Sequence, residues 1–162
     1  MLDRLQKLLR AFGGTGPAKP KFVFDEGDHR VAAAGLLVHA MNVDGVQSPL
    51  EMERLQTLLM ERFSLDETET KALIAVADQR DKEAVDFHAF TAVVKRAYNE
   101  EGRKRIVEMM WDVVFADGQL HEFEDNMVWR VAEIIGVPPT QRILIRKQVA
   151  AAHGLDLAEA GE

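Results

Sequence analysis

The stretch FADGQLHEFE, Phe115 to Glu124, follows an apolar segment with helical periodicity, and it has an upstream counterpart in NVDGVQSPLE, Asn42 to Glu51. In both stretches an Asp-Gly pair is followed by a glutamate seven residues after the aspartate. Each stretch also joins an apolar helix-like segment to an amphipathic one. The order apolar helix, turn, amphipathic helix therefore occurs twice in this chain.

An offset of 73 residues superposes the two copies without gaps, matching Asp44, Gly45 and Glu51 with Asp117, Gly118 and Glu124. The sequence predicts an all-α fold: a compact bundle of about seven helices from two duplicated helical units, plus a short N-terminal amphipathic helix. We expect the two units to form one core about a pseudo-twofold axis. The helices are expected near residues 28–43, 49–63, 66–80, 86–98, 102–116, 121–135 and 139–153.

Two segments are apolar enough to run through the centre of the bundle. Ala32 to Val43 carries no formal charge, and Ile106 to Ala116 carries only Glu108 and Asp112. His39, on the first segment, is expected to be a boundary histidine with a polar partner. In the helix near 121–135, the predicted apolar stripe consists of Leu120, Phe123, Met127, Val131 and Ile134.

Composition divides the chain into four parts: an amphipathic helix at 1–12, a Gly/Pro linker and lead-in at 13–27, a helical domain at 28–154 and an acidic tail at 155–162. Residues 1–12 alternate leucines with Arg4, Lys7 and Arg10. Two interpretations stay open for this helix. It packs against the domain or a partner, or it attaches the protein peripherally to an anionic membrane surface.

The charge is distributed unevenly. The net charge of the chain is −7, and residues 1–21 contribute +4, which leaves −11 for the rest. An acidic body repels nucleic acid phosphates, so we expect no nucleic-acid binding and instead a protein partner or cations. The oligomeric state is left open by the sequence.

Several chemistries are excluded by residue content. The chain has no cysteine, so it has no disulfide, thiolate nucleophile or zinc-thiolate site. No apolar run is long enough to span a membrane, and we expect a soluble, cytoplasmic protein, at most at the inner face of the membrane. HExxH, GxSxG and phosphate-loop motifs are absent, which predicts a non-enzymatic protein. A metal-dependent hydrolase built from scattered residues is the remaining enzymatic alternative.

The DG turns have an ordinary structural interpretation. Glycine readily adopts the left-handed conformation that ends a helix, and Asp-Gly is common turn chemistry. Ser48 and Glu51 have the spacing of a capping box, with Pro49 at the first helical position. His121 stands at the N-terminal boundary of the following helix. On this interpretation the repeated motif is a pair of helix caps in an interaction module.

The alternative interpretation is a divalent-cation site. An aspartate in the last turn of a helix faces the negative end of the helix dipole, and two such residues at matching positions call for compensation. The carboxylates of Asp44, Glu51, Asp117 and Glu124 are oxygen ligands that suit Ca2+ or Mg2+, and His121 is a fifth candidate ligand. The loops lack the EF-hand pattern and offer few ligands, which predicts weak binding.

The residues from Asp28 to His153 resemble the tellurite resistance TerB family, whose fold also forms the N-terminal TerB-like domain of the DjlA co-chaperone. The most specific likeness runs from Ala116 to Pro138, within FADGQLHEFEDNMVWRVAEIIGVP (residues 115–138), and VDGVQSPLE matches in the first copy. The resemblance implies a seven-helix bundle whose acidic DG loops bind divalent metal or partners. It also implies a role in stress responses and membrane-linked complexes, without an established enzymatic activity.

Two features depart from that family. The basic helix at 1–12 and its linker are not part of the common core. A cysteine-free, acidic protein is also a poor candidate for trapping or reducing tellurite itself, because thiols are absent and anions are repelled. Any link to tellurite is therefore expected to be indirect.

Overall fold

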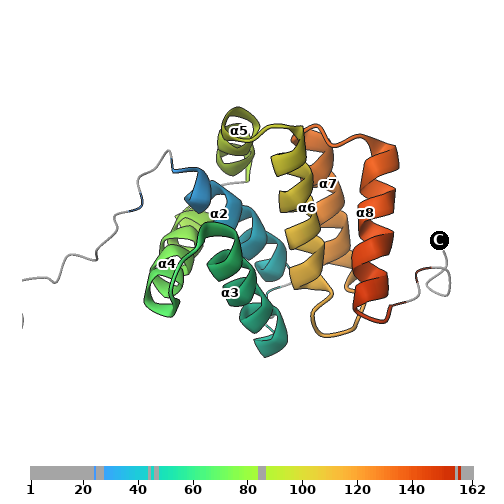
Figure 1. Cartoon of the computed structure of the whole chain (residues 1–162), viewed down its shortest axis with the longest axis horizontal. Coiled ribbons are helices and arrows are strands. Elements are labelled where there is room, and N and C mark those ends of the chain that lie inside the picture. Colours follow the sequence, from blue (N-terminus) through green and yellow to red (C-terminus); the bar gives the residue numbers. More distant parts are fainter. Residues whose placement is uncertain are drawn as a thin grey trace, which may run out of the picture.

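The computed structural model describes residues 24, 28–43, 45, 48–83, 87–155 and 157. Within these residues all regular structure is helical, which confirms the predicted all-α fold (Figure 1). The helix predicted at residues 1–12 lies outside the described residues. The seven helices are α2 (His29–Asn42), α3 (Pro49–Phe63), α4 (Glu67–Glu83), α5 (His88–Ala97), α6 (Glu100–Val114), α7 (Glu122–Ile134) and α8 (Pro139–Ala152).

The predicted duplication is visible as two three-helix units, α2–α4 and α6–α8, with α5 between them in sequence. In Figure 1 the first unit occupies one half of the domain and the second unit the other. The three helices of each unit contact one another, and α2 packs against α6 across the two units. Helix α3 also contacts α6, while its counterpart α7 contacts α2. This reciprocal exchange is the pattern that a pseudo-twofold arrangement produces.

The core is built around α2 and α6, as their low charge predicted. Ten residues of α2 are buried, from Val31 to Met41. Helix α5 lies over α2 at Gly35, where an added Cβ would stand 2.6 Å from Cζ of Phe90. Glycine is therefore required for this close approach. The counterpart of Gly35 in α6 is Glu108, which is exposed, so within the described part of the chain only the first unit has a helix over this face.

Histidine–aspartate pairs tie each central helix to the third helix of its unit. His39 Nδ1 of α2 lies 2.6 Å from Asp81 Oδ1 of α4, which confirms the predicted boundary histidine. His153 Nε2, at the end of α8, lies 2.6 Å from Asp112 Oδ1 of α6. His39 and Asp112 are counterparts in the repeat, so the two units make the same link with acid and imidazole exchanged.

Asp112 also joins α3 to α6, because Arg54 donates from Nε and Nη2 to its two oxygens at 2.9 and 2.8 Å. Burial raises the pKa of the Asp112 carboxyl, but the hydrogen bonds from Arg54 and His153 outweigh burial and hold the pKa below its usual 3.8. The ionised form is therefore favoured by folding. The resulting stability is present above pH 3.8 and is lost as the pH falls through the lower folded-state pKa.

We predict that Asp112→Asn lowers the free energy of unfolding at pH 7 by about 1–3 kcal/mol, because the partly buried donors of Arg54 and His153 lose a charged acceptor. The gap to wild type should shrink in acid below pH 3.8. Urea unfolding at pH 7 and at acid pH measures both effects. Glu108→Gln, one turn away on an exposed face, is the matched control. An equal loss at both pH values would contradict the assigned ionisation.

Candidate functional site

Three of the predicted ligands meet at the junction of the two units. Glu51 is the third residue of α3, Asp117 lies in the turn after α6, and His121 is the N-cap of α7. His121 Nε2 lies 2.7 Å from Asp117 Oδ2 and 3.9 Å from Glu51 Oε1. One ligand atom from each residue falls within 4.8 Å of the other two. The first unit contributes the glutamate, and the second unit contributes the aspartate and the imidazole.

The turn that presents Asp117 is closed by the backbone. Gly118 has φ +74°, in the left-handed region, and its N–H donates to the Phe115 carbonyl at 2.9 Å. Gly45 repeats this geometry with φ +77°, so the left-handed glycine predicted for both DG turns is confirmed. The amide of Gln119 donates to Asp117 Oδ1 at 3.0 Å. The turn therefore fixes the Asp117 carboxylate, with Oδ2 on the side of His121.

The predicted position of Asp117 in the last turn of a helix is wrong. Helix α6 ends at Val114, so Asp117 lies three residues beyond it, in the turn. The helix dipole therefore does not single out this aspartate, because the dipole acts within the last turn. At this junction the carboxylate whose charge calls for compensation is that of Glu51.

Glu51 carries its carboxylate into the interior, where its residue is 1% exposed. Burying an ionised carboxylate is costly unless nearby groups compensate its charge. Its place in the first turn of α3 supplies the positive end of the helix dipole. Ser48 makes no side-chain capping hydrogen bond, so the Ser48 half of the predicted capping box does not form. The imidazole of His121 thus lies between a buried glutamate and the turn aspartate.

The remaining two predicted ligands lie elsewhere or outside the described residues. Glu124 is the counterpart of Glu51 and is equally buried, in the first turn of α7. Its oxygens are not among the ligand atoms grouped around His121. Asp44 falls outside the described residues. The described part of the chain therefore brings together Glu51, Asp117 and His121.

Helix α7 is rotated relative to the predicted apolar stripe. Its buried residues are Glu124, Val128, Val131 and Ala132, while Leu120 and Phe123 are 38% and 71% exposed. The rotation has a physical cause in the neighbouring residue Asp125. Trp111 Nε1 donates to Asp125 Oδ1 at 3.0 Å, and Arg146 binds both oxygens of Asp125 at 2.7 Å. These contacts to α6 and α8 orient α7 with Glu124 inward.

Asp125 and Arg146 were not predicted as an ion pair, although a comparison of the two repeats could have indicated one. Their counterparts in the first unit, at offsets of 73 and 72 residues, are Met52 and Ile74, which pack against the core. A charged pair that replaces an apolar pair at matching positions indicates an ion pair between the two helices. The second unit therefore uses an ion pair where the first uses apolar packing.

We predict that Phe123→Ser lowers the free energy of unfolding by less than about 1 kcal/mol, because its side chain lies outside the buried core. Val128→Ala, at a fully buried position of the same helix, should cost about 2 kcal/mol from lost burial and the cavity left behind. Urea unfolding of both variants compares the two faces directly. If Phe123→Ser lowered the free energy of unfolding as much as Val128→Ala, Phe123 would belong to the buried face, as the predicted apolar stripe had it.

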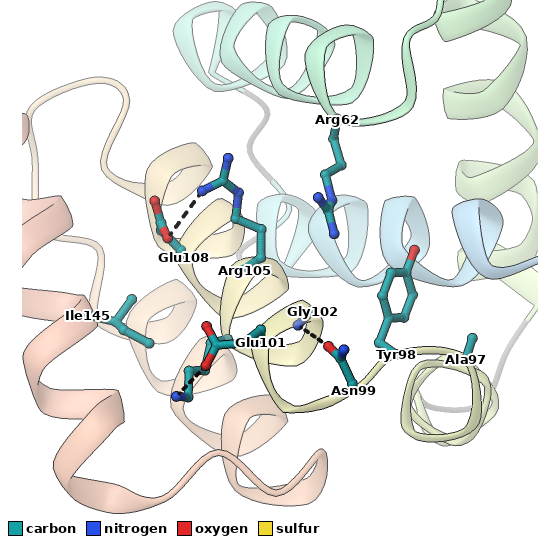
Figure 2. Close-up of a pocket in the computed structure, with 10 residues that line it drawn as sticks. Arg62, Ala97, Tyr98, Asn99, Glu101, Gly102, Arg105, Glu108 and Ile145 are labelled. Carbon is teal, nitrogen blue, oxygen red and sulfur yellow. Dashed lines mark hydrogen bonds and ion pairs between the residues drawn. The ribbon is translucent and has the colours of Figure 1, made fainter.

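A pocket of about 590 Å³ lies apart from this cluster, where α3, the α5–α6 junction, α6 and α8 meet. Figure 2 shows Arg62 and Tyr98 reaching into it from different elements. Burial raises the pKa of Tyr98 to about 12, so its hydroxyl stays protonated at neutral pH and is no base. Other charges in the lining are paired with one another, as in Lys104–Glu101 at 3.1 Å. None of the predicted ligands lines this pocket.

The fold and the junction define a helical module of two repeated units with acidic DG turns. A family model described as "Tellurite resistance protein TerB" matches residues 30–147. The chain therefore belongs to the TerB family, as its resemblance implied.

A solved structure supports the same fold. The chain is similar to a protein of unknown function from Porphyromonas gingivalis, with a TM-score of 0.57 and 18% identity, over 83% of this chain and 98% of the other. At this identity the likeness concerns the fold alone. No curated protein gave a significant match. Among the described residues, no helix has both the length and the apolar character needed to cross a membrane.

Proposed function

We propose that this chain is a non-enzymatic TerB-family module that binds a divalent cation between its two units, at Glu51, Asp117 and His121. The observation that carries the proposal is one imidazole placed 2.7 Å from one carboxylate and 3.9 Å from a second, buried one. With both carboxylates ionised and the imidazole neutral, the cluster would carry a charge of −2. A divalent cation balances this charge and takes its ligands from atoms that already converge.

The size and composition of the cluster suit a single ion. Metal–ligand bonds of about 2.0–2.5 Å put two ligands of one ion at most about 4–5 Å apart. The three ligand atoms already lie within 4.8 Å of one another. An imidazole nitrogen beside two carboxylates favours Zn2+ or Mn2+ over the Ca2+ or Mg2+ expected from the carboxylates alone. Water would complete the coordination.

A non-enzymatic role is supported by the surroundings of the cluster. Among the described residues, five well-formed pockets are lined by residues other than Glu51, Asp117 and His121. An enzyme usually binds its substrate in a pocket that includes its reacting groups. The cluster instead lies in an acidic region that suits a basic protein partner.

A second candidate function is a protein-interaction module without metal, in which the DG motifs serve as turns. The specific observation in its favour is the closed turn geometry, with left-handed Gly118 and the Gln119 amide bound to Asp117 Oδ1. These contacts account for Asp117 without a cation. They do not account for the buried position of Glu51.

We predict one saturable site when Zn2+ or Mn2+ is titrated calorimetrically into the chelator-treated full chain, with weaker heats for Ca2+ and Mg2+. Asp117→Asn and His121→Ala should each weaken binding about tenfold or more, because the first removes the charge of a ligand and the second removes a ligand. Affinity should fall as the pH is lowered, since protons compete for the same ligand atoms.

Glu122→Gln is the matched control, because Glu122 is an exposed acid next to His121 and outside the cluster. It should bind like wild type, and circular dichroism should show that all variants are folded. Absence of a saturable heat for all four cations would exclude the cation site and favour the interaction module. Equal affinity in wild type and both ligand variants would place any bound ion elsewhere.

A further inference from the structure

Three large apolar side chains are exposed around the junction of α3 and α7. They are Leu50 at 53%, Leu120 at 38% and Phe123 at 71% exposure, and we call them the junction patch. Leu50 and Phe123 are counterparts in the repeat, each the second residue of its helix. Because Glu51 and His121 approach to 3.9 Å, the residues beside them emerge at the same end of the domain. Exposed apolar side chains gathered in this way mark interaction surfaces.

The surroundings of the junction patch are acidic. The exposed acids beside it are Glu53 of α3 and Glu122 of α7, and no lysine or arginine occurs from Ile106 to Trp129 or from Val31 to Glu53. The arginines that reach this region from neighbouring helices are already bound to aspartates, as in Arg146 with Asp125. A ligand for this surface should therefore be apolar on one face and basic on its flanks.

The chain itself contains a segment of that kind. Residues 1–12 hold five large apolar side chains at helical spacing and three basic ones with a single acid; the apolar set is Leu2, Leu5, Leu8, Leu9 and Phe12. We propose that residues 1–12 dock on the junction patch of their own chain, with the leucines against Leu50, Leu120 and Phe123 and the basic side chains toward Glu53 and Glu122. Docking covers the patch and offsets local repulsion among the acids.

The length of chain allows this docking. The patch lies beyond the C-terminal end of α2, whose 14 residues span about 21 Å. Residues 13–27 connect the segment to the start of α2, and a stretch of this length reaches up to about 50 Å when extended. The connection is thus long enough to pass along α2 to the junction. This inference goes beyond the cation site and holds with or without a bound ion.

The absence of cysteine permits a clean cross-linking test. Gln6→Cys is paired with Gln119→Cys beside the patch, or with Thr140→Cys as the matched control. Gln119 and Thr140 are both exposed, and Thr140 lies at the opposite end of α7, about 20 Å away. The full-length variants are treated with a short bismaleimide at low protein concentration and with chelator present. Intact mass separates intramolecular from intermolecular products.

Docking predicts an intramolecular yield about tenfold or more higher for the 6–119 pair than for the 6–140 pair, because it raises the effective concentration of the two thiols. Added salt should lower that yield, since the attraction is partly electrostatic. Leu120→Ser with Phe123→Ser, in the 6–119 background, should reduce it to the control value. Circular dichroism verifies that each variant is folded.

Two results would overturn the proposal. Equal intramolecular yields at positions 119 and 140 would show that residues 1–12 have no preference for the junction patch. Products joined mainly between two chains would show instead that the segment binds a second copy. Because chelator is present throughout, neither result depends on the outcome of the cation titration.

Discussion

The packing of α2 against α6 is the contact on which the rest of the structure depends. Each of these helices contacts helices of both units, and ten residues of α2 alone are buried. The two units therefore need each other to form one core. The same packing brings the turns that follow α2 and α6 to one end of the domain. A site composed from both units is a direct consequence, since Glu51 and His121 belong to different repeats.

The buried acids follow from the same geometry. A left-handed glycine reverses the chain soon after each central helix, and the next helix then directs its third residue back toward the core. That residue is Glu51 in one unit and Glu124 in the other, both 1% exposed. An apolar residue would suit such a position at lower desolvation cost. The repeated choice of glutamate is the feature of this junction that the proposed cation site would explain.

Much of this fold was predictable because its signals are local. The absence of charged residues predicted the central helix α2, and the Asp-Gly pairs predicted both turns. The offset of 73 residues predicted that the two units correspond to each other. The rotation of α7 was not predictable from periodicity, because Phe123 and Glu124 are adjacent and either can begin an inward face. Asp125 settles the choice through partners on α6 and α8. Likewise Glu51 and His121 meet only through tertiary packing, while a role for Asp44 stays a prediction.

The two units share a backbone plan but differ in chemistry. Helix α5 covers α2 at Gly35, whereas the matching position of α6 is the exposed Glu108, beside the charged pocket of Figure 2. The N-caps differ as well: Ser48 in the first unit corresponds to His121 in the second, and neither side chain caps its helix. Since imidazole is a far better metal ligand than a serine hydroxyl, the two DG turns are unequal as ligand sets. Of the two DG turns, only the second is followed by a histidine. For the proposed function, this asymmetry favours one cation at the junction over a pair of equivalent cation sites.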